Sequence, residues 1–173
     1  PKRDKIVLFL GRITLQKGPD YFISAAKRVL DHRSARDVTF VMAGSGDMQP
    51  FLIEKAAQLG IADKVLFMGF LRGDDVDKAY QMADLYVMPS VSEPFGITPL
   101  EALKNNVPVL ISRQSGVSEV LNHCLKADFW DVDDIADKII SFFQYTELQD
   151  ALREYGRAEV QRFSWDDSAQ KCL

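Results

Sequence analysis

Cysteine, histidine and long apolar runs are all scarce in this chain of 173 residues, and each scarcity removes a class of function. The two cysteines, Cys124 and Cys172, lack metal-ligand spacing and are too few for a disulfide framework, which favours a reducing, cytoplasmic location. The histidines, His32 and His123, have no matching acids or cysteines at ligand spacing, so we expect surface or packing roles for both. No apolar run approaches the ~20 residues of a membrane-spanning helix. No signal-peptide pattern opens the chain either, so we expect no transmembrane segment.

Familiar catalytic and nucleic-acid signatures are absent as well. The net charge of -4 at pH 7 offers no basic footprint, so we expect no nucleic-acid partner. The patterns G-x-S-x-G, H-E-x-x-H and C-x-x-C do not occur, which leaves serine-nucleophile and metal-hydrolase mechanisms without support. The complete G-x-G-x-x-G spacing of dinucleotide-binding folds is missing too, and this argues against an NAD-type domain.

Apolar runs recur at the spacing of alternating strands and helices. Hydrophobic residues make up 47% of the chain and charged residues 27%, which is typical of a globular domain. Some runs are almost uninterrupted in apolar character, as in parallel strands that are covered on both faces. These runs are residues 6–10, 38–43, 65–68, 85–88 and 107–111. Helical stripes lie between or after them, in residues 21–30, 51–59, 76–82, 99–103 and, more briefly, 117–121.

This alternation predicts an α/β fold with a doubly wound, Rossmann-like parallel sheet and C-terminal helices. From Asp131 onward only helical patterns remain, and Ser164 or Asp166 is placed to cap a last short helix. The sequence shows no internal repeat, low-complexity stretch or linker, so we expect residues 1–173 to form a single domain. Because its opening residues enter a strand almost at once, we also expect this domain to be a piece of a longer protein.

Two glutamates eight positions apart, Glu93 and Glu101, are the most informative feature of the sequence. An apolar run ends at Pro89, a polar loop follows, and a helical pattern begins near Thr98. Glu93 is thereby predicted on a loop at the carboxyl end of a strand, and Glu101 about one turn inside the next helix. Ligands of open α/β sheets bind outside these strand ends, and an ionised carboxylate accepts two hydroxyl donors. The pair therefore suits a ligand with sugar hydroxyls and with a phosphate at the helix start.

The loop after the first predicted strand carries two cations, Arg12 and Lys17, behind Gly11. An arginine fork and a lysine point charge suit a diphosphate. Two solvated loop charges are an equally good interpretation of this loop taken alone.

Two further strand ends carry candidate binding residues. Gly44 and Gly46 follow the second predicted strand, where they form either a phosphate-binding turn or simply a tight strand-to-helix turn. Leu71 follows the third strand, and its backbone is a candidate to border a nucleobase. After the fifth strand, Glu119 is best interpreted as a solvated acid in a first helical turn.

Five segments occur in a characteristic order: GRITLQKGPDYFISA, VMAGSGD, VLFMGFL, ADLYVMPSVSEPFGITPLEAL and PVLISRQSGVSEVL. Together they resemble the C-terminal, donor-binding domain of the retaining glycosyltransferases of family 4, which include glycogen and sucrose synthase relatives. The resemblance covers nearly the whole chain, and the two glutamates are its most specific part. It implies one half of a GT-B fold, in which two Rossmann-like domains enclose the catalytic cleft. The partner implied is an N-terminal acceptor domain of the same enzyme, which is absent from this chain.

The resemblance also implies a role for each matching residue. Arg12 and Lys17 would hold the donor diphosphate and offset the charge of the leaving group. Glu93 would lie under the donor sugar and complete the catalytic set, and Glu101 would accept the ribose hydroxyls. The donor site would be completed by the strand-end candidates Gly11, Gly44, Gly46 and Leu71 and by the backbone of Phe95, Gly96, Ile97 and Thr98.

The implied reaction transfers a hexose from a UDP-, ADP- or GDP-linked sugar to an acceptor hydroxyl, with retention of configuration. The leaving phosphate would help to deprotonate the acceptor, without a cofactor or an essential metal. Alternatives are a sugar-nucleotide epimerase or phosphorylase on the same scaffold, and a non-catalytic module that binds nucleotide sugars. Two departures from the family stand out: Gln114-Ser115-Gly116 in place of paired glycines, and HCLKADFW in place of a glycine-rich segment.

Overall fold

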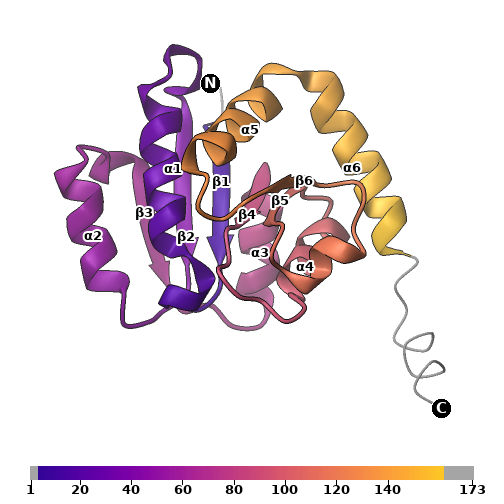
Figure 1. The fold of residues 1–173 in the computed structure, drawn as a ribbon, viewed down its shortest axis with the longest axis horizontal. Coiled ribbons are helices and arrows are strands. Elements are labelled where there is room, and N and C mark those ends of the chain that lie inside the picture. Colours follow the sequence, from indigo (N-terminus) through magenta and orange to yellow (C-terminus); the bar gives the residue numbers. More distant parts are fainter. Residues whose placement is uncertain (1–3, 162–173) are drawn as a thin grey trace.

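A computed structural model describes residues 4–161, which form a parallel sheet covered by helices on both faces (Figure 1). The strands are β1 (Lys5–Leu10), β2 (Val38–Ala43), β3 (Val65–Gly69), β4 (Leu85–Met88), β5 (Val109–Ser112) and β6 (Leu125–Ala127). The α-helices are α1 (Pro19–Asp31), α2 (Gln49–Gln58), α3 (Asp74–Met82), α4 (Thr98–Lys104), α5 (Val132–Gln144) and α6 (Thr146–Val160). Short 3-10 turns occupy Leu15–Lys17, Arg33–Ala35, Ala62–Lys64 and Gly116–Glu119.

The order of the strands in the sheet is β3-β2-β1-β4-β5-β6. The chain therefore adds β2 and β3 on one side of β1, and then β4, β5 and β6 on its other side. The reversal point lies between β1 and β4, which pair in parallel, Val7 with Leu85 and Leu8 with Tyr86. This order is that of a doubly wound, dinucleotide-type sheet, in which the reversal leaves a crevice at the carboxyl ends of the two central strands. The predicted fold class is confirmed.

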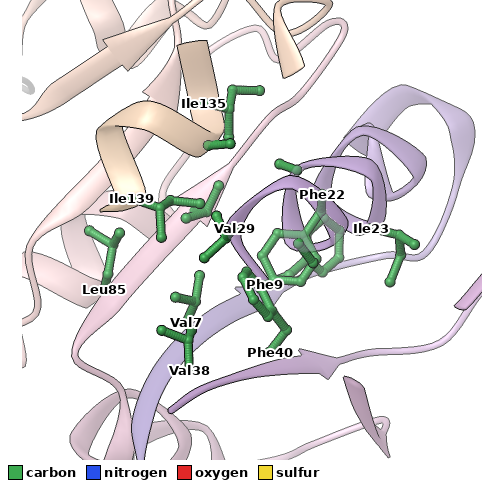
Figure 2. Packing of buried hydrophobic residues seen from close by; sticks show 14 of the residues in the cluster. Val7, Phe9, Phe22, Ile23, Val29, Val38, Phe40, Leu85, Ile135 and Ile139 are labelled. Atoms are coloured by element: carbon green, nitrogen blue, oxygen red, sulfur yellow. The ribbon is translucent and has the colours of Figure 1, made fainter. Parts of the chain in front are cut away.

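The buried apolar side chains of the strands divide between two hydrophobic clusters because successive side chains of a strand point to opposite faces. Val7 and Phe9 of β1 pack with α1, α2 and α5, whereas Leu8 packs with α3 and α4. In the first cluster the Phe22 ring of α1 lies 5.6 Å from the rings of both Phe9 and Phe40 (Figure 2). Helix α6 packs against α4 and α5 at the end of the described chain. Helices thus cover both faces of the sheet, so a ligand can reach the sheet only at the strand ends, where the loops begin.

Most predicted elements are confirmed, with three corrections. The fifth strand begins at Val109 rather than at residue 107, because Pro108 has no N–H to donate to a neighbouring strand. The expected helix at 117–121 is a 3-10 turn, in which N–H groups bond to carbonyls three residues back, as Ser118 does to Ser115. The strand β6 was not expected. The predicted helix cap at Ser164 or Asp166 lies outside the described residues. Within the described range no helix has the length and apolar character that a membrane crossing requires.

Candidate functional site

The loops that follow β1 and β4 lie side by side at the reversal point of the sheet. The first leads to α1 on one face and the second to α4 on the other face. The backbone ties them together, since the carbonyl of Gln16 accepts hydrogen bonds from the N–H groups of Val91 and Ser92, at 3.0 and 3.4 Å. Residues that the sequence separates by more than seventy positions are thereby held in one place.

Lys17 and Glu93 form an ion pair across these two loops. Their side chains retain only 21% and 12% of their full exposure, so the pair is largely withdrawn from solvent. Two of the three predicted catalytic residues are therefore in direct contact. The third, Arg12, is exposed and makes no ion pair with any of residues 4–161. A carboxylate and a cation at one point of the crevice suit a ligand that carries hydroxyls next to phosphate.

The Glu93 loop is also fixed from the side of β5. The carbonyl of Glu93 accepts a hydrogen bond from the N–H of Gly116 at 2.9 Å, and the carbonyl of Phe95 accepts one from Val117 at 2.7 Å. These bonds hold the backbone of the loop on both sides of Pro94. The position of the Glu93 carboxylate is consequently set by three strands, β1, β4 and β5, through the loops that follow them.

Gly96 is required by the path of this loop. Its φ of +96° lies in a region that favours glycine. A Cβ at this position would lie 3.1 Å from Cγ of Glu93 and 3.3 Å from Cε of Met88. The absence of a side chain at Gly96 therefore allows the loop to close over Glu93.

The segment that enters α4 presents both donors and apolar side chains. Within the part of the chain that the structure describes, the backbone N–H groups of Gly96 and Ile97 donate to no protein acceptor. The side chains of Phe95 and Ile97 are 44% and 51% exposed, which is high for large apolar residues. Exposed apolar groups beside available N–H donors are common features of ligand sites, and the predicted residues 95–98 lie here.

Two buried tyrosines stand behind α4. The Tyr80 hydroxyl lies 3.1 Å from Oε2 of Glu101 and 3.3 Å from the carbonyl oxygen of Thr98. The Tyr86 hydroxyl donates to Oγ1 of Thr98 at 2.8 Å and lies 3.2 Å from the carbonyl oxygen of Leu10. Burial raises the pKa of both phenols far above the ordinary value, so both remain neutral donors. Thr98 and Glu101 are thus held by hydrogen bonds from the core.

Sequence reasoning did not identify these tyrosines as supports of α4. Tyr80 was assigned to an apolar helical stripe and Tyr86 to an apolar strand. A signal was available, because a buried tyrosine usually needs a hydrogen-bond partner for its hydroxyl, unlike a phenylalanine at the same position.

A cavity of about 230 Å³ lies beside the loop after β1. It brings four predicted residues together, Gly11, Arg12, Gly44 and Leu71, whereas Gly46 is not part of its lining. The other lining residues are Leu10, Ala43, Ser45, Phe70 and Val76. A mostly apolar cavity with one arginine in its lining suits a flat ring with a polar edge.

The two glycines after β2 explain how the neighbouring loops pack. A Cβ on Gly44 would lie 1.8 Å from the carbonyl oxygen of Gly11, and a Cβ on Gly46 would lie 2.1 Å from that of Ile13. Both distances are far below van der Waals contact, so each position requires glycine. This supports the tight-turn interpretation of the two glycines; direct ligand contact by either one stays a prediction.

The remaining candidates from the sequence have structural roles. His123 stacks near Tyr155 and its Nδ1 lies 3.3 Å from Glu159, while His32 bonds to Ser34, as expected of packing and surface residues. Burial raises the pKa of the Cys124 thiol to about 11, which keeps it protonated. Among residues 4–161 there is no cluster of three or more His, Cys, Asp or Glu side chains that could hold a metal ion.

Comparison with known proteins identifies the family. The sequence model of the family described as glycosyl transferases group 1 matches residues 1–159. The chain belongs to this family. It is 37% identical over 177 residues to an uncharacterised glycosyltransferase of Methanocaldococcus jannaschii, with 98% of this chain covered. It spans only 44% of the length of that relative, so the activity of a whole protein is a matter of proposal.

Solved structures of glycosyltransferases share the fold. The C-terminal domain of a glycosyl transferase group 1 family protein from Francisella tularensis has a TM-score of 0.83 and 26% identity. The match covers 93% of this chain and 86% of that domain. Anabaena HepE in complex with UDP has a TM-score of 0.87 and 22% identity, with 98% of this chain and 48% of HepE covered. The prediction of a Rossmann-like unit of a GT-B glycosyltransferase is confirmed at the level of fold and family.

Proposed function

We propose that this chain is the donor-binding domain of a retaining glycosyltransferase that moves a hexose from a nucleotide-diphospho-sugar to an acceptor hydroxyl. Family membership, the position of the site at the strand ends and the likeness to the C-terminal domain from Francisella support this proposal. The UDP that is bound to HepE supports a nucleoside diphosphate as part of the ligand. The inferred partner is an N-terminal acceptor domain of the same enzyme, on the other side of the cleft.

The observation that carries the proposal is the contact between Lys17 and Glu93. A nucleotide sugar carries a diphosphate next to a ring of hydroxyls. In this proposal Lys17 is the cation for the diphosphate, and Glu93 beside it is the acceptor for the sugar hydroxyls. The two residues come from the neighbouring loops after β1 and β4. In the proposed complex Lys17 turns from Glu93 to the diphosphate, and Glu93 accepts hydroxyls of the hexose.

The chemistry of transfer rests on charge. As the glycosidic bond breaks, negative charge grows on the departing diphosphate, and Arg12 and Lys17 are positioned to stabilise it more strongly than in the ground state. The departing phosphate oxygen takes the proton of the acceptor hydroxyl, which then attacks from the same face. The proposal needs no cofactor and no metal.

The nucleoside part of the ligand is assigned to neighbouring groups. The cavity lined by Phe70, Leu71 and Val76 is apolar, as a stacked nucleobase requires. Glu101 lies in the first turn of α4, is exposed, and bonds to the Tyr80 hydroxyl through Oε2. We assign it to the ribose hydroxyls, which donate to a carboxylate.

Titration calorimetry tests the proposal on the chain itself. The ligands are UDP, ADP and GDP with their glucose conjugates, and we expect one of these nucleotides to bind. Lys17→Ala should weaken that binding, whereas Lys27→Ala, which removes an equal charge from α1 away from Glu93, should not. Transfer to an acceptor is not expected without the second domain. Absence of binding by every nucleotide at mM concentration would contradict the proposal, and so would turnover by this chain alone.

A further inference from the structure

Tyr80 occupies a position between the core and the rim of the crevice. It belongs to α3 and its side chain is fully buried, yet its hydroxyl reaches Glu101, a residue that is itself exposed. We propose that Tyr80 is a positioning residue, whose hydroxyl holds the Glu101 carboxylate in the orientation that receives a pair of ribose hydroxyls. This inference rests on the proposed function of Glu101.

The hydrogen bond has a defined direction. Burial keeps the Tyr80 phenol protonated, so it donates its single proton and the carboxylate accepts. The alternative acceptor, the carbonyl of Thr98, is 0.2 Å farther from the hydroxyl (3.3 against 3.1 Å) and belongs to the same helix start. With Oε2 held in this way, the other carboxylate oxygen, Oε1, has no hydrogen-bond partner among residues 4–161.

Holding the carboxylate matters because Glu101 would otherwise be free to rotate. An exposed glutamate samples several side-chain conformations, and binding selects one of them at an entropic cost. A buried tyrosine on a neighbouring helix is rigid, since its ring packs edge-on against Tyr86 at 5.9 Å. Tyr80 therefore orients the Glu101 carboxylate before the ligand binds. It does so through Oε2 and leaves Oε1 for the ribose hydroxyls.

Tyr86 provides the matched control. It is equally buried and is part of the same ring pair, but its hydroxyl serves Thr98 and Leu10 rather than Glu101. Replacing either tyrosine by phenylalanine removes one buried hydroxyl and keeps the ring. A general loss of stability should affect both variants, whereas a loss of ribose recognition should affect only Tyr80→Phe.

The experiment compares UDP with 2′,3′-dideoxy-UDP by calorimetry, or ADP or GDP with its dideoxy form if that nucleotide binds better. In Tyr80→Phe we expect roughly three- to tenfold weaker binding of the hydroxylated nucleotide, the range for one net hydrogen bond. Binding of the dideoxy nucleotide should be unchanged. Tyr86→Phe should keep the wild-type ratio between the two ligands. Adding Tyr80→Phe to Glu101→Ala, which has no acceptor for the phenol, should have no further effect.

A second variant avoids the core altogether. Glu101→Asp keeps the charge at an exposed position but shortens the side chain beyond the reach of the Tyr80 hydroxyl, so it should also lose the preference for the hydroxylated nucleotide. A wild-type ratio in both Tyr80→Phe and Glu101→Asp would overturn the inference. An equal loss for both nucleotides in Tyr80→Phe would also overturn it and show a purely structural role.

Failure of the proposed function gives a different result. In that case the wild-type chain binds no nucleotide, or Glu101→Gln keeps the full preference for the ribose hydroxyls. Either result removes Glu101 as the ribose acceptor and overturns the role of Tyr80 with it.

Discussion

Lys17 and Glu93, on loops from different strands, form an ion pair with each other. The pair lies on the loops that follow the neighbouring strands β1 and β4, and both charges are largely shielded from solvent. A diphosphate that binds Lys17 must therefore compete with Glu93. This relationship makes the two residues interdependent and leads to the first prediction.

Glu93→Gln should change the affinity for free nucleotide and the affinity for the nucleotide sugar differently. Removal of the carboxylate releases Lys17, so free nucleoside diphosphate should bind roughly two- to fivefold more tightly, in keeping with the ~0.4–1 kcal/mol of a partly exposed ion pair. The nucleotide sugar should gain less or lose affinity, because its hydroxyls lose their acceptor. Calorimetry with both ligands measures the difference. If free nucleotide binds as poorly to this variant as to Lys17→Ala, the competition between Glu93 and the diphosphate does not exist.

Arg12→Ala and Lys17→Ala should reduce turnover more than donor affinity in the proposed two-domain enzyme. Their charges are needed most when the diphosphate departs, and removal of one such preorganised group costs about 10²–10³-fold in rate. Steady-state kinetics with the preferred donor give both quantities. Lys27→Ala is the control for loss of a cation outside the site. Near-normal rates in both site variants would mean that these two cations are simply solvated.

Gly96→Ala should damage the site, whereas Gly60→Ala should only strain the backbone. Both glycines have positive φ, +96° and +69°, so alanine should cost about 1–2 kcal/mol of folding free energy at either position. A Cβ at Gly60 meets no atom within 4 Å, but at Gly96 it presses on Glu93 and Met88. We expect urea titrations to show similar losses of stability, with loss of nucleotide-sugar binding only in Gly96→Ala. Equal binding by the two variants would show that the loop tolerates a side chain.

Glu159 should make stability dependent on pH in the acid range. Its burial alone would raise its pKa, but hydrogen bonds from the backbone and side chains of His123 and Asn122 outweigh this and hold the pKa below the ordinary value of 4.5. A carboxyl with a lowered pKa stabilises the fold fully above its unfolded-state pKa, and this contribution is lost as the pH falls through the folded-state value.

Urea unfolding of wild type and Glu159→Gln between pH 7 and pH 3 tests this contribution. At pH 7 the variant should be less stable by roughly 1–3 kcal/mol, because a buried set of donors loses its charged acceptor. The difference should shrink as the pH falls below about 4.5. A difference that is constant with pH would show that Glu159 does not titrate differently in the folded and unfolded chain.

The sequence predicted the fold well because its strands and helices have strong patterns. The run at 38–43 is apolar except for Thr39 and is buried throughout as β2. The strand β6 escaped notice because it has only three residues and a lysine, Lys126, at its centre. Such a strand is defined by its pairing with β5 rather than by its own composition.

The sequence predicted which loops and which helix carry the candidate residues, but not the contacts between them. The positions of Glu93 and Glu101 followed from the end of a strand and the start of a helix, which are local features. The Lys17–Glu93 pair depends on the order of strands in the sheet, since only the adjacency of β1 and β4 brings the two loops together. The link from Tyr80 to Glu101 depends likewise on the packing of α3 beside α4, which no local pattern contains.

The most direct test of the account is a map of amide chemical shifts in the ¹⁵N-labelled chain, titrated with the nucleotide that binds best and with its sugar conjugate. We predict that the nucleotide shifts Gly11, Arg12 and Lys17 together with Glu101, and that the sugar conjugate adds shifts at Gly96 and Ile97. Shifts that cluster instead on the outer face of α6, around Arg153 and Arg157, would contradict the assignment of the donor site to the loops after β1 and β4.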